Sequence, residues 1–109
     1  MRPQFYIDSF KDKEGKEHPF VICAVVKEVH VDDCVFYTLN LGYSICNPHD
    51  TFNENLGKTI ALGRANKKED YDLLTFNKGT LNIKVICAVL TSEANYLKRN
   101  PGYKVAGYK

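Results

Sequence analysis

The segment CVFYTLNLGYSIC (Cys34–Cys46) carries a large apolar side chain at every second position. These positions are Val35, Tyr37, Leu39, Leu41 and Tyr43. Because alternate residues of an extended chain lie on one face, the segment is predicted to be a β-strand with one apolar face. Gly42 interrupts this strand and marks either a bulge or a close approach of another backbone.

Two earlier segments have the composition of strands, QFYIDSF (Gln4–Phe10) and PFVICAVVKEVHV (Pro19–Val31). A charged turn around Gly15 separates them, and Asp32-Asp33 separates the second segment from Cys34. Turns this short join antiparallel neighbours, so a meander of three strands is predicted.

The signals of a helix start follow the third strand. Asn47 is a preferred N-cap residue, Pro48 is favoured at the first helical position, and the charge of Asp50 suits the first turn. A stripe with four-residue spacing is predicted to lie on the sheet, namely Phe52, Leu56 and Ile60. Lys67 and Lys68 are predicted to end the helix, because their charges suit its C-terminus.

The remaining chain is predicted to add a short strand at Leu73–Phe76 and a second helix. Residues 81–99 fit either one long helix or a strand and a short helix, and the helical spacing covers more residues. Asn100-Pro101-Gly102 closes this segment like a helix end, and the tail YKVAGYK (103–109) has the spacing of an edge strand. The predicted fold class is α+β, with one domain over residues 1–109. An antiparallel β-sheet, made of the three-stranded N-terminal meander and C-terminal strands, packs with two α-helices.

Composition restricts the class of protein. With 109 residues, of which 44% are apolar and 26% charged, the chain suits one globular core. No apolar run approaches the roughly 20 residues that span a bilayer. The start MRPQFYIDSF lacks the pattern of a signal peptide. We expect a soluble, cytoplasmic protein with no membrane partner and no cofactor.

The four cysteines lie at positions 23, 34, 46 and 87 and are expected to be reduced, small hydrophobic residues. One alternative is a zinc site, in which His30 and Cys34 combine with Cys46 and His49. Both pairs lie at predicted strand ends among ordinary neighbours, which argues against metal.

Charge is divided unevenly along the chain. Residues 1–57 hold five Lys and Arg against nine Asp and Glu, whereas residues 58–109 hold ten against four. Such asymmetry accompanies anionic partners and antiparallel dimers, although solvated faces also produce it.

The triplet Gly57-Lys58-Thr59 is not a phosphate loop, because position 52 is Phe and the triplet lies within the predicted helix. Three small residues instead follow helical spacing, namely Gly57, Ala61 and Ala65. One interpretation of this strip is close helix-on-sheet packing within the chain. The other is that a second subunit or a flat ligand packs there, beside Arg64, whose guanidinium suits phosphate or carboxylate.

A second candidate site is the run YLKRNPGYKVAGYK (Tyr96–Lys109), where aromatic and basic residues interleave. Rings stack on bases while cations neutralise phosphate, a combination that suits nucleotides or single-stranded nucleic acid. A solvated helix end and an edge strand guarded by lysines would look the same. Phe76 and Asn77, predicted to lie on a loop, would suit an adenine ring.

Motifs of catalysis are weak. The acids of Asp32-Asp33 and of Glu69-Asp70-Asp72 are adjacent in predicted turns, where charge is usually solvated. Neither Gly-x-Ser-x-Gly nor HExxH occurs. We therefore expect a protein that is not an enzyme.

The segment YSICNPHDTFNENLGKTIALGRA, together with NPGYKVAGY, resembles segments of small proteins carried by tailed bacteriophages. The family it is most similar to is the Thoeris anti-defence sponge family, whose members bind a cyclic ADP-ribose signal, and in some cases cyclic oligonucleotides, without degrading it. The resemblance implies a homo-oligomer with pockets between subunits, in the cytoplasm of an infected host.

The hypothesis from the sequence is a non-catalytic phage counter-defence protein that sequesters an anionic nucleotide. Arg64 and Arg99 would bind phosphate, and the rings of Phe76, Tyr103 and Tyr108 would stack on the ligand. The alternative is a small phage accessory protein that binds a host protein or nucleic acid through its basic C-terminal half.

Overall fold

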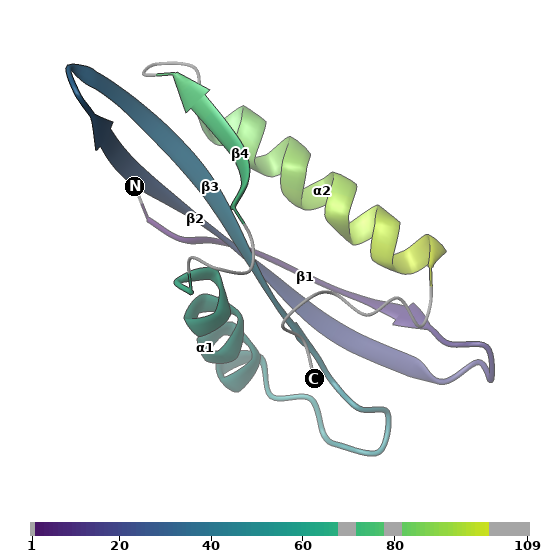
Figure 1. Cartoon of the computed structure of the whole chain (residues 1–109). Helices are drawn as coiled ribbons and strands as arrows, with labels where there is room; N and C mark the ends of the chain where they lie inside the picture. Colours follow the sequence, from purple (N-terminus) through teal and green to yellow (C-terminus); the bar gives the residue numbers. More distant parts are fainter. Residues whose placement is uncertain (1, 68–71, 78–81, 101–109) are drawn as a thin grey trace.

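The computed structural model of the chain describes residues 2–67, 72–77 and 82–100, and for 72–77 we describe the backbone only. The elements, in chain order, are β1 (Gln4–Lys11), β2 (Glu17–Val31), β3 (Cys34–Ile45), α1 (Glu54–Ala65), β4 (Asp72–Asn77) and α2 (Ile83–Arg99). Figure 1 shows one continuous sheet with a helix on either side. The predicted α+β class, with an antiparallel sheet and two helices, is confirmed.

The sheet is an antiparallel meander in the order β1-β2-β3-β4. The predicted three-stranded meander is confirmed, and the strand predicted at Leu73–Phe76 is β4, which pairs with Phe36–Asn40 of β3. The β2–β3 hairpin closes through Asp32-Asp33, where Asp32 has φ 53°, a left-handed conformation that Asp tolerates. Short turns therefore account for the pairing of β1, β2 and β3, whereas β4 follows a connection that contains α1.

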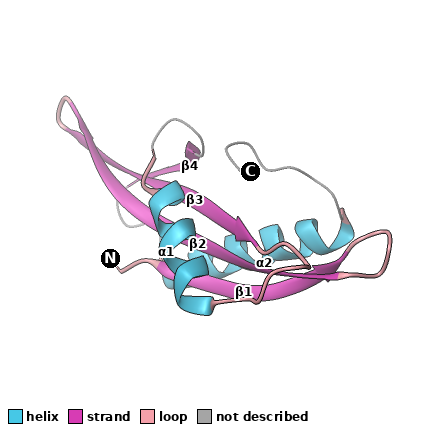
Figure 2. Cartoon of the chain, turned by 90° about the horizontal axis from the view of Figure 1, so that it is seen from below, coloured by secondary structure: helices cyan, strands magenta, loops and turns pink. Residues whose placement is uncertain are grey.

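Alternation along the strands gives the sheet two apolar faces. On one face, which we call the α2 face, Phe20, Ile22, Leu39 and Leu41 pack with α2. On the other, the α1 face, Val21 and Cys23 pack with Ala61 and Ala65 of α1. The result is a three-layer arrangement of helix, sheet and helix, which Figure 2 shows from below.

Helix α1 begins six residues later than the sequence predicted. Asn53 is the N-cap, and its side-chain oxygen accepts a hydrogen bond from the Leu56 amide at 3.0 Å. Asn47 instead accepts from the His49 amide at 3.0 Å and opens a turn. The prediction of a start at Asn47-Pro48 was wrong because Asn and Pro favour turns as strongly as helix starts. The end predicted at Lys67 and Lys68 was also late, since α1 ends at Ala65.

The prediction of which face of α1 lies on the sheet was also wrong. The stripe of Phe52, Leu56 and Ile60 was predicted to face the sheet, but Leu56 is 57% exposed. The buried residues of α1 are Gly57, Ala61 and Ala65. Of the two interpretations of this small strip, close packing within the chain is the observed one, so the strip is not open to a second subunit.

Gly42 of β3 explains why the small residues of α1 are the ones buried against the sheet. A methyl group at Gly42 would meet the Ala61 carbonyl oxygen and the Ala65 amide nitrogen well inside van der Waals distance, and the Ala65 Cα at 3.0 Å. The helix backbone therefore rests directly on the strand backbone. The close approach predicted from Gly42 is confirmed, and larger residues cannot occupy either side of this contact.

Helix α2 forms one continuous helix, as favoured from its spacing. Its N-cap Asn82 accepts from the Val85 amide at 3.1 Å, and Asn100 is its C-cap, where the helix end was predicted. The Tyr43 hydroxyl donates to Glu93, which joins the middle of α2 to β3.

Asp8 of β1 and Lys98 of α2 form an ion pair at the end of the α2 face. Partial burial raises the pKa of Asp8, but the hydrogen bond and charge of Lys98 and the Ser9 amide together outweigh it. The pKa of Asp8 therefore lies below its ordinary value of 3.8.

This ion pair makes the stability of the fold depend on pH in the acidic range. Since the folded pKa of Asp8 is depressed, its stabilising effect is fully present above the unfolded pKa of about 4 and is lost as pH falls through the folded pKa. We expect Asp8→Asn to lower the melting temperature at pH 7 and to match wild type by about pH 2. Thermal unfolding followed by circular dichroism between pH 2 and 7 measures both quantities.

Glu14→Gln is the matched control, because this carboxylate is 75% exposed in its pair with Lys16. We expect it to keep the melting temperature of wild type at pH 7. Equal melting temperatures of Asp8→Asn and wild type at pH 7 would show that the Asp8–Lys98 pair does not stabilise the fold.

Candidate functional site

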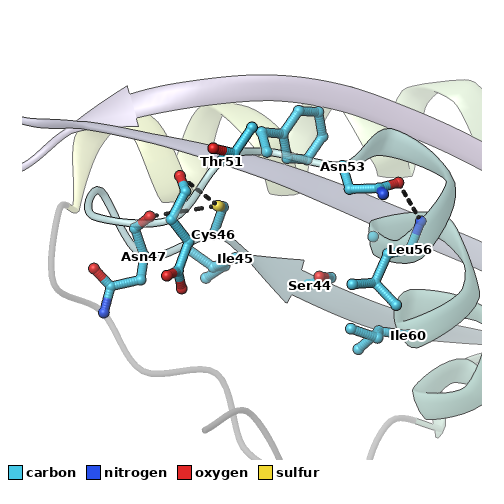
Figure 3. A pocket seen from close by; sticks show the side chains of 11 residues that line it. Ser44, Ile45, Cys46, Asn47, Thr51, Asn53, Leu56 and Ile60 are labelled. Atoms are coloured by element: carbon cyan, nitrogen blue, oxygen red, sulfur yellow. Dashed lines mark hydrogen bonds between the residues drawn. The ribbon is translucent and has the colours of Figure 1, made fainter.

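A groove lies between the start of α1 and the end of β3, and we call it the α1 groove. It has a volume of about 360 Å³. Figure 3 shows the residues that line it, which are Ser44, Ile45, Cys46, Asn47, Asp50, Thr51, Phe52, Asn53, Leu56, Gly57 and Ile60. The loop 46–53, which the sequence had assigned to the helix, forms one wall.

Local hydrogen bonds hold this loop in shape. The Asn47 side chain accepts from the His49 amide, and the Asn47 carbonyl accepts from the Asp50 amide at 3.0 Å. The Cys46 Sγ lies 3.4 Å from the Asn47 carbonyl oxygen and 3.7 Å from that of Asp50. The loop is thus a compact turn that begins where β3 ends and finishes at the cap of α1.

The helix wall of the groove is apolar. Leu56 and Ile60 are one turn apart on the side of α1 that faces away from β1, and Phe52 lies at the base of the helix. Leu56, at 57% exposed, is the most exposed large apolar side chain among the described residues. Arg64 follows Ile60 by one turn and donates from Nη1 to the Tyr43 carbonyl oxygen at 2.7 Å.

The opposite wall is polar and carries little charge. Hydroxyl groups come from Ser44 and Thr51, an amide comes from Asn47, and a thiol comes from Cys46. Among the described residues that line the groove, Asp50 is the charged one. An apolar wall facing hydrogen-bonding groups is the usual chemistry of a small-molecule site, in which flat apolar surface gives affinity and polar groups fix orientation.

His18 ties the loop to the β1–β2 turn. Its Nδ1 lies 3.1 Å from the Cys46 carbonyl oxygen, its Nε2 lies 2.8 Å from Asp12 Oδ2, and its ring stacks on Phe10. Both ring nitrogens lie within hydrogen-bond distance of oxygen atoms, so the ring links the loop to the β1–β2 turn. The hydrogen bond from His18 holds the pKa of Asp12 below its ordinary value, against a smaller opposing effect of burial. The His18 side chain is 18% exposed, so these contacts are partly shielded from solvent.

The two arginines predicted to bind phosphate do not share a site. Arg64 lies on α1, on one face of the sheet, and Arg99 is the last residue of α2, on the other. Arg99 instead belongs to the α2 outer surface, which consists of Lys84, Cys87, Ala88, Thr91, Ser92, Asn95 and Arg99. A joint site in one chain is therefore excluded.

Of the other predicted ligand residues, two lie in β4 and two lie outside the part of the chain that the structure describes. Phe76 and Asn77 are the last residues of β4, opposite Tyr37 and Phe36 of β3, and not part of a loop. Tyr103 and Tyr108, with the edge strand predicted in the tail, lie outside the described residues.

The zinc alternative is wrong in this fold. His30 and Cys34 lie at the closed end of the β2–β3 hairpin, and Cys46 and His49 lie beyond the opposite end of β3. Among the described residues, no three His, Cys, Asp or Glu side chains form a group that would hold a metal.

Sequence reasoning missed most of the groove. It named Asp50 and Asn47 as helix-start residues and Cys46 as a candidate zinc ligand, and it gave Ser44 and Thr51 no role. The available signal was the length of the polar segment between Cys46 and Asn53, which contains two Asn and one Pro, residues that favour turns.

No family model matches the chain, and comparisons with curated proteins and with solved structures return no match. In the part of the chain that the structure describes, the helices are all too short or too polar to cross a lipid bilayer. The α1 groove and the surfaces of the two helices are therefore the features that indicate a function.

Proposed function

We propose that this protein is a non-catalytic binding protein that sequesters a small ligand of the nucleotide type in the α1 groove. The observation that carries the proposal is the pairing of an apolar wall, the exposed Leu56 and the half-buried Ile60, with hydroxyl and amide groups in a groove of about 360 Å³. This volume lies within the range of about 300–1,000 Å³ typical of small-molecule sites.

The two walls suit different parts of such a ligand. A base would lie against Leu56 and Ile60, whose burial would contribute affinity. Its polar edge and a ribose would face Ser44, Asn47 and Thr51. The Asp50 carboxylate repels a phosphate within the groove, so a phosphate would extend along α1 toward Arg64.

A narrower form of the proposal comes from the resemblance to phage proteins. In this form the ligand is a cyclic ADP-ribose or cyclic oligonucleotide immune signal, and the protein is a counter-defence sponge made in the host cytoplasm. Since a sponge binds without chemistry, denaturation would release the ligand intact.

Binding of a nucleotide panel, which includes cyclic ADP-ribose, tests the proposal by calorimetry and thermal shift. We expect Leu56→Glu to weaken binding by about tenfold, because it places a carboxylate on the apolar wall beside the ligand. Asn55→Glu is the matched control, since it adds the same charge at an exposed neighbour that does not line the groove. No binding by any member of the panel, or equal effects of both variants, contradicts the proposal. Recovery of a hydrolysed ligand points instead to an enzyme.

A second candidate function is binding of nucleic acid or a host protein by the α2 outer surface. The observation in its favour is that this surface combines Lys84 and Arg99 with hydroxyl and amide side chains, and contains no acidic residue among those described. Retention of single-stranded DNA or RNA that falls steeply with salt, and that Arg99→Gln weakens, would support nucleic acid as the partner.

A further inference from the structure

The β2–β3 hairpin extends well beyond β1. The register pairs β1 with Glu17–Ala24 of β2, but β2 continues to Val31. Among the described residues, no strand pairs with residues 25–31 on that side of β2, and we call this stretch the β2 open edge. Figure 1 shows this end of the hairpin projecting past the start of β1.

The backbone of the open edge presents regular hydrogen-bonding groups. The Cys46 amide donates to the Pro19 carbonyl oxygen at 2.8 Å, which shows that odd-numbered residues of β2 bond to β3. Along an antiparallel strand, residues whose amide and carbonyl point toward one neighbouring strand alternate with residues whose amide and carbonyl point to the opposite side. The amides and carbonyls of Val26, Glu28 and His30 therefore point outward, where they can act as a template for a further strand.

The side chains of this edge are self-complementary. Glu28 and His30 lie on the same face of β2, and His30 Nε2 is 3.1 Å from Glu28 Oε2. We propose that a second copy of this chain pairs with the β2 open edge as an antiparallel strand, with Val29 opposite the partner's Val29 and Glu28 opposite the partner's His30. In this register the outward amides and carbonyls of Glu28 and His30 bond to those of the partner.

Charge pairing and steric fit both favour the register with Val29 opposite the partner's Val29. A shift of two residues in one direction places Glu28 opposite the partner's Glu28, and like charges in that position destabilise a sheet. It also drives the partner's hairpin turn onto the start of β1, where Gln4 pairs with Ala24. The opposite shift places Glu28 opposite the partner's Asp32, a second like-charge pair. The register through Val29 avoids each conflict.

The same register covers apolar surface. Antiparallel pairing by a two-fold axis perpendicular to the sheet keeps the α1 faces of both copies on one side. Val31, which is 51% exposed, then lies opposite the partner's Lys27 and packs on its aliphatic stem. The α1 grooves of both copies then lie on the same side of the extended sheet and stay open. Dimer formation therefore neither requires a ligand nor blocks ligand binding.

Sedimentation of the full chain tests this inference. We expect a reversible dimer with a dissociation constant of about 10 µM to 1 mM, as suits an interface smaller than about 1,200 Å². Hydrogen exchange adds a residue-level measurement. The amides of Glu28 and His30 should become protected as concentration rises, whereas the Val29 amide, bonded to β3, should be protected throughout.

Variants separate this edge from other interfaces. His30→Glu places like charges opposite each other and should abolish the dimer, and the swap Glu28→His/His30→Glu should restore it. His49→Glu is the matched control, because it makes the same change at an exposed residue beyond the far end of β3. A wild-type chain that stays monomeric at about 1 mM, or a dimer that His30→Glu leaves intact, overturns the inference. Either result leaves the proposed ligand binding unaffected.

Discussion

We expect Gly42→Ala to lower the free energy of unfolding by about 3 kcal/mol or more, and to leave much of the protein unfolded at 37 °C. The added methyl group would collide with the backbone of α1 at Ala61 and Ala65, neither of which can rotate away as a side chain can. Relief requires α1 to lift from β3, which would expose Val21 and Cys23 beneath it. Urea unfolding followed by circular dichroism measures the loss.

Two other glycines provide internal controls for this prediction. Gly63 lies in the same helix, and apart from its chain neighbours and the backbone of its own helix no atom of the described residues lies within 4 Å of an added methyl group. Gly63→Ala should therefore stabilise the protein by about 0.5–1 kcal/mol through helix propensity. At Gly57 the obstacle is the Val21 side chain at 2.9 Å, so Gly57→Ala should stay within about 1 kcal/mol of wild type. A mild effect of Gly42→Ala would mean that α1 does not rest on β3.

The second large effect concerns Asn40, which is fully buried in β3. Among the side chains and backbone that the structure describes, neither its amide nitrogen nor its amide oxygen has a hydrogen-bond partner. A buried amide without partners carries a desolvation penalty of about 1–3 kcal/mol. We expect Asn40→Val, which suits a buried strand position, to raise the free energy of unfolding by about 1–2 kcal/mol in urea titrations.

Asn40→Asp provides the matched contrast, since it keeps the shape of the side chain and places a carboxylate in the same buried position. We expect it to destabilise the protein, and more strongly at pH 7 than at pH 4, because the charged form is the one that burial disfavours. A loss of stability in Asn40→Val would show that the Asn40 amide makes a favourable contact in the native protein.

Much of the fold followed from local sequence patterns. The alternation at Cys34–Cys46 and the short turn at Asp32-Asp33 require antiparallel neighbours, and the structure has them. The caps at Asn82 and Asn100 mark α2 as clearly as its spacing does. Such features depend on residues close in sequence, and for that reason a single sequence can reveal them.

Much less of the candidate site could be predicted from local sequence patterns. Asn47-Pro48 satisfies the local rules for a turn and for a helix start. In the structure the Asn47 side chain accepts from the His49 amide within a turn, and His18, distant in sequence, holds the Cys46 carbonyl at the start of that turn. Arg64 and Arg99 are both basic residues at helix ends, but which face of the sheet each helix covers depends on contacts between segments distant in sequence.

By itself, the amino-acid sequence determined the first three strands and their meander, because period and turns are local properties of the chain, and it favoured α2 without excluding a strand followed by a short helix. Only the tertiary structure decided which side of α1 is buried. Hydrophobicity favoured Leu56 and Ile60, yet Gly42 lets the helix backbone approach so closely that small residues alone fit between helix and strand. The displaced leucine and isoleucine are left to line the α1 groove, so the packing that excluded them from the core also made the candidate site.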